Sequence, residues 1–274
     1  MPKLRLAGGA VKLHYHDAGA GSTPVLFLHG FPFTSEMWLP QRDALAGSHR
    51  VIIPDLRGFG ASETLEDGCS MARLADDAAE LLDALGLRQA VIAGLSMGGY
   101  VAFEFFNRHR DRVLSLALCD TRPEPDSDEA RSNRAAMAQR ARSEGSGAVA
   151  DELLPKLLSN WSRAQKHDLE RFLRDMMESV KPETIEAALV GMANRTDSRP
   201  LLPRIDVPVL VVVGSEDPIT PPDDVRAWAA QIPNARVEVV EGAAHVPNLE
   251  QPGPFNTVLA DFLAGLSDAT PGAD

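Results

Sequence analysis

The feature that most constrains the fold is a serine flanked by glycines at the end of an apolar run. The pentapeptide GLSMG at 94–98 follows the apolar residues 90–93 and precedes the helix-forming residues 100–106. A strand that turns this sharply into a helix strains its central residue and brings backbone segments close together, so side chains at 94 and 98 would block the turn. The context predicts a strand–turn–helix unit that exposes the Ser96 hydroxyl as a nucleophile.

A serine nucleophile needs a base and a carboxylate that orients the base. His245 is the candidate base, because it lies on the loop that follows the predicted strand 236–240. Asp217 is the candidate acid, because it follows the apolar run 209–213 at the carboxyl end of a predicted parallel strand. The chain order Ser96, Asp217, His245 is the order expected of a serine on this kind of turn.

The oxyanion formed by attack of the serine also needs hydrogen-bond donors. The predicted strand 25–29 runs into the turn HGFP at 29–32, where the amide of Phe31 is expected to point at the same spot as the amide of Met97. These two N–H groups form the predicted oxyanion hole. His29 lies beside the turn, and we expect its side chain to brace the turn from beneath rather than to transfer protons.

Five segments of the chain resemble motifs of the α/β-hydrolase family and occur in that family's order. They are HGFP at 29–32, DLRGFGAS at 55–62, GLSMGG at 94–99, GSEDPITPP at 214–222 and GAAHVPNLEQP at 242–252. The resemblance covers residues from about 13 to 121 and from 201 to 266. It implies the fold of that family and a serine–histidine–aspartate triad.

Two other carboxylates compete with Asp217 for the role of the acid. Glu216 precedes it by one residue, and Asp120 follows the predicted strand 113–119, where some members of the family place their acid. We favour Asp217, because an Asp followed by Pro at this loop is part of the resemblance and a buried Asp that accepts the imidazole N–H holds the right tautomer. Asp120 is otherwise interpreted as a helix or turn cap ahead of Thr121.

Short apolar runs alternate with helical patterns, which is typical of a mostly parallel sheet covered by helices on both faces. The predicted fold class is therefore α/β, with an eight-stranded, mostly parallel, doubly wound sheet and a helical cap inserted after strand 6. Strands are predicted at 4–6, 12–16, 25–29, 51–54, 90–93, 113–119, 209–213 and 236–240. The predicted domains are a core formed by 1–121 and 201–274, and a cap formed by 122–200.

The cap is predicted because about ninety residues separate two successive strands, which is far more than a crossover needs. Its apolar residues recur at helical spacing, and we expect four helices over the carboxyl ends of the strands. Four large side chains form an apolar stripe that either lines a substrate pocket or packs as the cap's own core. They are Trp161, Phe172, Met176 and Met177.

The predicted reaction is acyl transfer. Ser96 attacks a carbonyl, His245 moves the proton to the leaving group, and water releases the acyl-enzyme. Haloalkane dehalogenases and epoxide hydrolases place an aspartate at the elbow, where this chain has Ser96, and the cap tyrosines of epoxide hydrolases have no counterpart, since Tyr15 and Tyr100 lie outside the cap. We expect a carboxylic ester hydrolase without cofactor or metal that cleaves a small ester or lactone.

Several alternatives remain open within the resemblance. GLSMGG and AHVPNLEQP are most similar to esterases and enol-lactonases, whereas the HGFP turn is closer to esterases and to cofactor-free perhydrolases (haloperoxidases). Activity like that of 3-oxoadipate enol-lactonase, carbon–carbon bond hydrolysis and perhydrolysis are therefore alternatives. A non-enzymatic alternative is a small-molecule receptor that keeps the hydrolase fold.

Composition restricts the partners. The 274 residues include 27 Lys and Arg against 39 Asp and Glu, a net charge of −12, which argues against binding to nucleic acid or an anionic membrane. Two cysteines without a C-x-x-C spacing predict neither a disulfide framework nor a zinc site. Without a signal-peptide pattern at the start, we expect a cytoplasmic protein that is a monomer or a small homo-oligomer.

Overall fold

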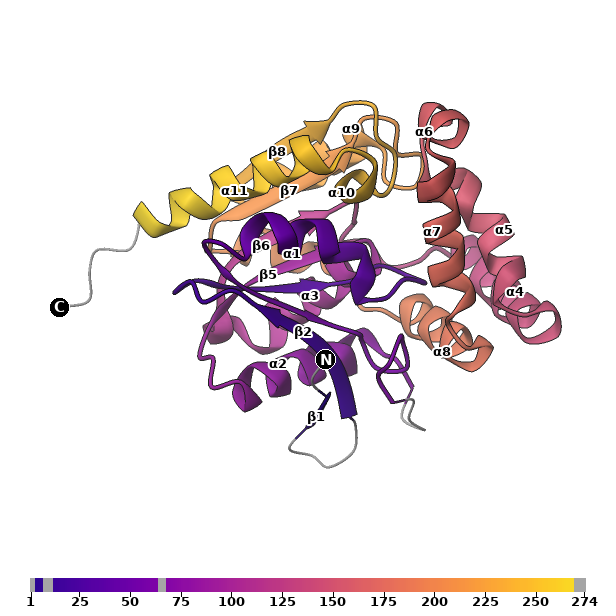
Figure 1. The fold of residues 1–274 in the computed structure, drawn as a ribbon, viewed down its shortest axis with the longest axis horizontal. Helices are drawn as coiled ribbons and strands as arrows, with labels where there is room; N and C mark the ends of the chain where they lie inside the picture. Colours follow the sequence, from indigo (N-terminus) through magenta and orange to yellow (C-terminus); the bar gives the residue numbers. More distant parts are fainter. Residues whose placement is uncertain (1–2, 7–11, 64–67, 269–274) are drawn as a thin grey trace.

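The computed structural model describes residues 3–6, 12–63 and 68–268, and its centre is one eight-stranded sheet (Figure 1). Across the sheet the strand order is β1-β2-β4-β3-β5-β6-β7-β8. The strands are β1 (Lys3–Arg5), β2 (Lys12–Ala18), β3 (Pro24–Leu28), β4 (Arg50–Pro54), β5 (Ala90–Leu95), β6 (Val113–Cys119), β7 (Val209–Gly214) and β8 (Ala235–Val240).

The sheet is parallel except at one edge. β2 pairs antiparallel with both β1 and β4, and every other neighbouring pair is parallel. The parallel strands are continuous apolar runs because helices cover both of their faces. The prediction of an eight-stranded, mostly parallel, doubly wound sheet is confirmed.

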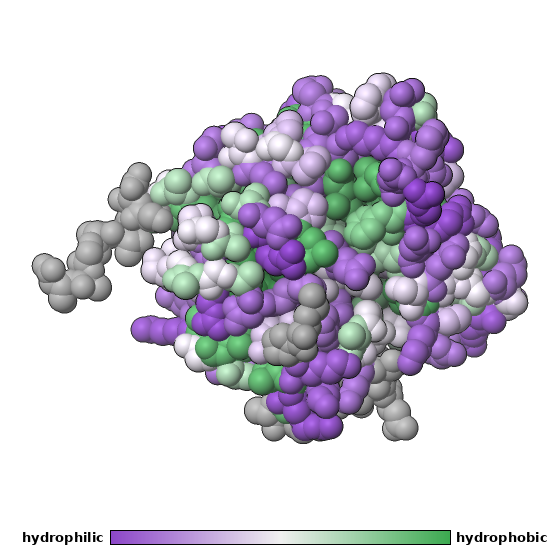
Figure 2. Space-filling view, in the orientation of Figure 1, coloured by the Kyte–Doolittle hydropathy of each residue, from purple (hydrophilic) through white to green (hydrophobic). Residues whose placement is uncertain are grey.

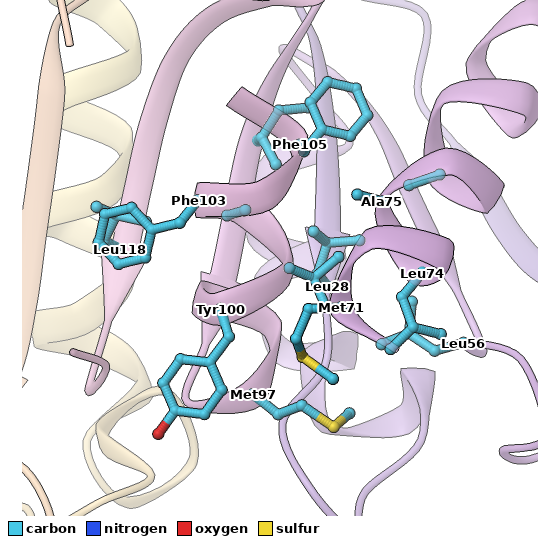
Figure 3. Close-up of a cluster of buried hydrophobic side chains, with 14 of the residues drawn as sticks. Leu28, Leu56, Met71, Leu74, Ala75, Met97, Tyr100, Phe103, Phe105 and Leu118 are labelled. Atoms are coloured by element: carbon cyan, nitrogen blue, oxygen red, sulfur yellow. The ribbon is translucent and has the colours of Figure 1, made fainter. Parts of the chain in front are cut away.

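Helices α2 (Met71–Ala84), α3 (Met97–Arg108) and α9 (Pro222–Ala229) bury their apolar faces in one hydrophobic cluster. Figure 3 shows part of this cluster, in which Phe103 points from α3 toward Leu118 of β6. Helices α1 (Leu39–Leu45), α10 (Pro247–Glu250) and α11 (Pro252–Asp268) contribute to the second cluster, on the other face of the sheet. The sheet is therefore the middle of three layers.

Five helices lie between β6 and β7, one more than predicted. They are α4 (Asp128–Glu144), α5 (Ser146–Leu157), α6 (Asn160–Gln165), α7 (His167–Glu178) and α8 (Pro182–Ala193). The additional helix is α6, whose six residues are too short for a periodic apolar pattern. Three 3₁₀ segments complete the described elements: η1 (Ser35–Trp38), η2 (Arg110–Arg112) and η3 (Arg199–Arg204).

The five helices gather on one side of the molecule, in pink to orange in Figure 1. They contact loops that leave the carboxyl ends of strands, because Thr184 of α8 donates to Gly58 O after β4 and Leu157 O of α5 accepts from His245 N after β8. The face in Figure 2 is largely hydrophilic, with apolar side chains gathered between the core and α7. Within the described ranges, no helix combines the length and apolar character that a membrane crossing requires.

Candidate active site

The turn between β5 and α3 holds Ser96 in a strained conformation. Its φ is 54° and its ψ is −113°, a region that a residue with a side chain rarely adopts. The flanking glycines have the role predicted for them, since a Cβ at Gly94 would lie 2.2 Å from Gly98 O and a Cβ at Gly98 would lie 2.1 Å from Leu28 O. The Ser96 N–H donates to Cys119 O at 2.9 Å, which ties the turn to β6.

The structure brings Ser96, His245 and Asp217 together from three separate loops. His245 Nε2 lies 2.9 Å from Ser96 Oγ, and His245 Nδ1 lies 2.7 Å from Asp217 Oδ2. Because the Asp217 carboxylate accepts a hydrogen bond from His245 Nδ1, the neutral imidazole carries its proton on Nδ1. Its Nε2 is then free to accept a hydrogen bond from the serine hydroxyl. His245 and Asp217 are buried, whereas Ser96 is half-buried.

The Asp217 carboxylate is surrounded by hydrogen-bond donors. Burial alone would raise its pKa, but the facing charge of His245 and hydrogen bonds from His245, Thr220 Oγ1 and the Ile219 N–H lower the pKa below the usual range overall. The bond from Ile219 N to Asp217 Oδ1 is 2.8 Å. The carboxylate is therefore ionised at neutral pH and oriented on both of its oxygens.

Asp120 and Glu216, the two competing carboxylates, occupy different surroundings. Glu216 is exposed and no hydrogen bond joins its side chain to His245 in the described structure. Asp120 is buried directly after β6 and accepts from Gly214 N at 2.9 Å. Of the three, only Asp217 is hydrogen-bonded to His245.

The two predicted oxyanion donors follow neighbouring parallel strands. Leu28 of β3 pairs with Gly94 of β5, so Phe31 and Met97 each lie three residues past one register position at the same edge of the sheet. Met97 is the first residue of α3, where an N–H has no intrahelical acceptor. Neither amide donates to another described residue. Both are thus available to a ligand oxygen.

His29 is fully buried and held at both ring nitrogens. Its Nε2 accepts from Leu56 N at 3.0 Å, so its Nδ1 donates to Gly30 O at 2.9 Å. Burial lowers the pKa of His29 to about 4, against smaller opposing effects of the Gly30 hydrogen bond and of Asp55. This neutral imidazole joins the Phe31 turn to the loop after β4.

The loop that carries His245 is tied to the inserted helices. The His245 N–H donates to Leu157 O at 3.1 Å, at the end of α5. Glu250 of α10 accepts from Ser159 N at 2.9 Å and from Ala244 N at 2.5 Å, and its backbone carbonyl accepts from Lys166 Nζ. Sequence reasoning missed Glu250, because only its complete burial distinguishes it from an ordinary surface glutamate.

A cavity of about 370 Å³ lies between the inserted helices and two of the site loops. Phe31 of the oxyanion turn and Ile219 of the Asp217 loop line it, together with Met137 of α4, Leu153 of α5 and Leu189 of α8. Polar and charged side chains also line it: Asn133, Arg134, Arg140, Glu152 and Lys156. Sequence periodicity marked Leu153 and Leu189 as apolar helix positions, but it could not show which face looks toward the sheet.

The predicted pocket stripe does not form one surface. Trp161 is 55% exposed, and the centroid of its ring lies 5.4 Å from Lys166 Nζ. Met177 is fully buried in the hydrophobic cluster that contains Leu173. Phe172 and Met176 line a different cavity, with His14 and Asp55. The prediction of a pocket formed by these four side chains is therefore corrected, because α6 and α7 present them to solvent, to the core and to a separate groove.

One group of possible metal ligands occurs in the described ranges. Ligand atoms of Asp120, Asp217 and His245 lie within 4.8 Å of one another, and all three residues are buried. Asp217 and His245 are already joined by a 2.7 Å hydrogen bond, and a metal ion bound between them would have to replace that bond. The arrangement fits orientation of a base better than it fits a metal centre.

Comparisons with known proteins identify the fold family of the chain. A family model described as alpha/beta hydrolase fold matches residues 23–252. The chain is 41% identical to a thermophilic esterase from Thermogutta terrifontis, solved with malate bound, at a TM-score of 0.93 with 97% of this chain and 98% of that chain covered. It is 31% identical to the enol-lactonase from Burkholderia xenovorans LB400, at a TM-score of 0.89 with 96% and 100% covered.

A third relative carries a different name. The chain is 30% identical over 286 residues to a non-heme chloroperoxidase of Kitasatospora aureofaciens, with 92% of this chain and 96% of that protein covered. Esterase, enol-lactonase and haloperoxidase relatives thus share one architecture with this chain.

Proposed function

Since the chain belongs to the α/β-hydrolase fold family, we propose that it is a serine hydrolase that cleaves a small carboxylic ester through an acyl-enzyme. The single observation that carries the proposal is the hydrogen-bonded series from Ser96 Oγ through His245 to Asp217, with distances of 2.9 and 2.7 Å. A nucleophile, a base and an orienting carboxylate in this geometry activate a serine hydroxyl.

In the proposed mechanism, Ser96 Oγ attacks the ester carbonyl while His245 Nε2 takes its proton. The oxyanion that forms accepts hydrogen bonds from the amides of Phe31 and Met97. His245 then protonates the departing alcohol and the carbonyl of the acyl-enzyme re-forms. Water, deprotonated by the same imidazole, attacks this carbonyl, and release of Ser96 gives the carboxylic acid.

Asp217 acts on the imidazole rather than on the substrate. Its carboxylate is held by Ile219 N and Thr220 Oγ1 and faces Nδ1, so it keeps the proton on that nitrogen and stabilises the imidazolium. The low pKa of Asp217 supports this role, because the carboxylate remains ionised when His245 becomes positively charged.

We assign residues 122–200 to a cap domain and residues 1–121 and 201–274 to the core. The 370 Å³ cavity between them is the proposed acyl pocket, since it begins at the oxyanion turn and at the Asp217 loop. Apolar side chains such as Met137 and Leu153 share its lining with polar ones, and its volume lies near the lower end of the range typical of small-molecule sites, which supports a preference for short acyl groups. Cytoplasmic location and a small-molecule ester as the partner remain part of the proposal.

Lactone hydrolysis is the second candidate. The likeness to the enol-lactonase from B. xenovorans, at 31% identity over nearly the whole of both chains, favours it. A lactone is an internal ester, so the same serine, base and oxyanion donors would open it.

The proposal is tested by covalent labelling with a fluorophosphonate and by turnover of p-nitrophenyl acetate and butyrate. We expect one label per chain, on the peptide that contains Ser96, together with loss of ester turnover in the labelled protein. A panel of lactones run beside the esters decides between the two candidates. A chain that hydrolyses neither, or that is labelled elsewhere, would contradict the proposal.

A further inference from the structure

Asp120 is a buried acid that the proposed mechanism does not use. It follows β6 with a φ of 43°, and it is 1% exposed. Positive φ strains a residue with a side chain, so the surrounding structure must hold Asp120 in place. Its N–H donates to Val212 O and its Oδ1 accepts from Gly214 N at 2.9 Å, which fixes the carboxyl group beside β7.

The other carboxyl oxygen of Asp120, Oδ2, accepts no hydrogen bond from a described residue. Oδ2 is buried without a hydrogen-bond donor among the described residues, and the carboxyl group lies within 4.8 Å of ligand atoms of both Asp217 and His245. A buried carboxylate oxygen without a donor is strongly unfavourable, and two ionised carboxylates this close repel each other. A protonated carboxyl group removes both penalties, because its hydroxyl can donate to Asp217.

We propose that Asp120 is an un-ionised carboxylic acid at neutral pH and a positioning residue, which donates a hydrogen bond to the Asp217 carboxylate behind the His245 imidazole. The two aspartates then share one proton, held on Asp120, and one negative charge, held on Asp217. The expected effects of this hydrogen bond on kcat and on the pH profile rest on the proposed function. The protonation state of Asp120 does not.

The surroundings support this assignment. The titratable groups that face Asp120 are Cys119 of β6, Asp217 and His245 on the loops after β7 and β8, and Glu250 of α10. Burial, followed by the negative charge of Asp217, raises the pKa of Asp120 well above its usual range, while the Gly214 hydrogen bond opposes this rise. The pKa of Asp217 is lowered, so the proton belongs to Asp120.

An asparagine at this position reproduces the pattern that the proposal requires. Its Oδ1 can accept from Gly214 N while its Nδ2 donates toward Asp217, as the hydroxyl of the un-ionised acid does. Asp120→Asn should therefore keep kcat/KM for p-nitrophenyl acetate within about threefold and leave the acid limb of the pH profile within about 0.3 pH unit of the wild type. Asp120→Leu removes the donor, and we expect a lower kcat with unchanged KM and an acid limb moved to higher pH, because Asp217 then stabilises imidazolium more strongly.

A direct measurement uses infrared difference spectroscopy on the purified protein at pH 7. The carboxylic acid C=O stretch should be present in the wild type and in Ser96→Ala, absent in Asp120→Asn, and unchanged in Asp111→Asn, which alters an exposed acid. A band that survives in Asp120→Asn would overturn the inference, as would an acid limb that moves to lower pH in that variant, since this shift means that a negative charge was removed. The band is measured without turnover, so an inactive protein that shows it would contradict the proposed function alone.

Discussion

The carboxylate of Glu250 joins the backbone N–H of Ser159, between α5 and α6, to the backbone N–H of Ala244, next to His245. One buried side chain thus fixes the loop of the proposed base against the inserted helices. The Leu157 carbonyl, which accepts from His245 N, reinforces the same junction.

We expect Glu250→Gln to lower kcat with little change in KM. Both carboxylate oxygens of Glu250 accept from backbone N–H groups, so the NH₂ group of a glutamine would face one of these donors and displace the His245 loop. The loss of stability should be about 1–3 kcal/mol. Steady-state kinetics and urea unfolding measure the two effects. Glu129→Gln, at an exposed position of α4, is the matched control; an equal effect in both variants would show that the junction is irrelevant to turnover.

Ser96→Ala should reduce ester turnover by at least about a thousandfold, because only binding and the oxyanion donors remain to act. The fold should persist, since His245 is the only described residue to which Ser96 Oγ is hydrogen-bonded. Turnover is measured on purified protein whose thermal unfolding matches the wild type. Residual activity above about one thousandth would contradict the assignment of the nucleophile.

Asp217→Asn should reduce kcat by roughly 10³–10⁴-fold, because the amide favours the wrong imidazole tautomer and leaves the imidazolium without a partner. Asp120→Asn is the matched comparison, with the same change in a neighbouring buried acid and a far smaller effect. The reverse ranking in kcat would move the orienting acid to the loop after β6.

Stability should decrease in acid partly through His29. Its folded-state pKa of about 4 lies below the ordinary 6.5, so the unfolded chain binds the proton first as the pH falls. The stabilisation is complete above about pH 6.5 and is lost progressively down to pH 4, by about 3 kcal/mol for this group.

The control for that prediction is His29→Gln, whose side-chain oxygen can still accept from Leu56 N. Urea unfolding of both proteins at pH 7 and pH 4 isolates the contribution of His29, because the carboxylates are common to both. Identical losses between the two pH values would show that His29 does not titrate as its burial requires.

Acetate to butyrate esters should exceed octanoate in kcat/KM, because the proposed acyl pocket measures about 370 Å³ and Met137 and Leu153 line it. Met137→Ala should shift the preference toward longer chains by about tenfold, the effect of one or two methylenes in a pocket. When the protein is supplied with acetate and hydrogen peroxide, we expect it to form peracetic acid slowly, because peroxide can replace water as the acyl acceptor. An unaltered preference in Met137→Ala, or an octanoate optimum in the wild type, would place the acyl group elsewhere.

The sequence predicts this fold well because each strand is a local apolar run with its own turn signals. All eight predicted strands are present, with ends that differ by at most two residues. The Ser96 turn is equally local, since its glycines and the flanking strand and helix are adjacent in the chain. The loop positions of Asp217 and His245 follow from the same strand pattern.

The cap could not be predicted to the same depth. Helical periodicity marks which residues are apolar, but orientation of α6 and α7 depends on contacts with distant loops, such as that of Met176 Sδ with Thr34 N. Trp161 and Met177 therefore looked equivalent in sequence and are exposed and buried, respectively. The partners of Glu250 are likewise invisible until the segment after α5 and the loop before α10 are placed in space.

The positive φ of Ser96 has a consequence for how this protein can change over generations. Strain of this kind amounts to about 1–3 kcal/mol, and glycine adopts the same backbone without it. A screen that rewards heat resistance alone would therefore favour Ser96→Gly, the one replacement that relaxes the turn and discards the proposed nucleophile. Ser96 is one of two non-glycine residues with positive φ in the described ranges, and keeping a serine there would require selection on turnover, so that thermostability and the proposed chemistry compete at a single codon.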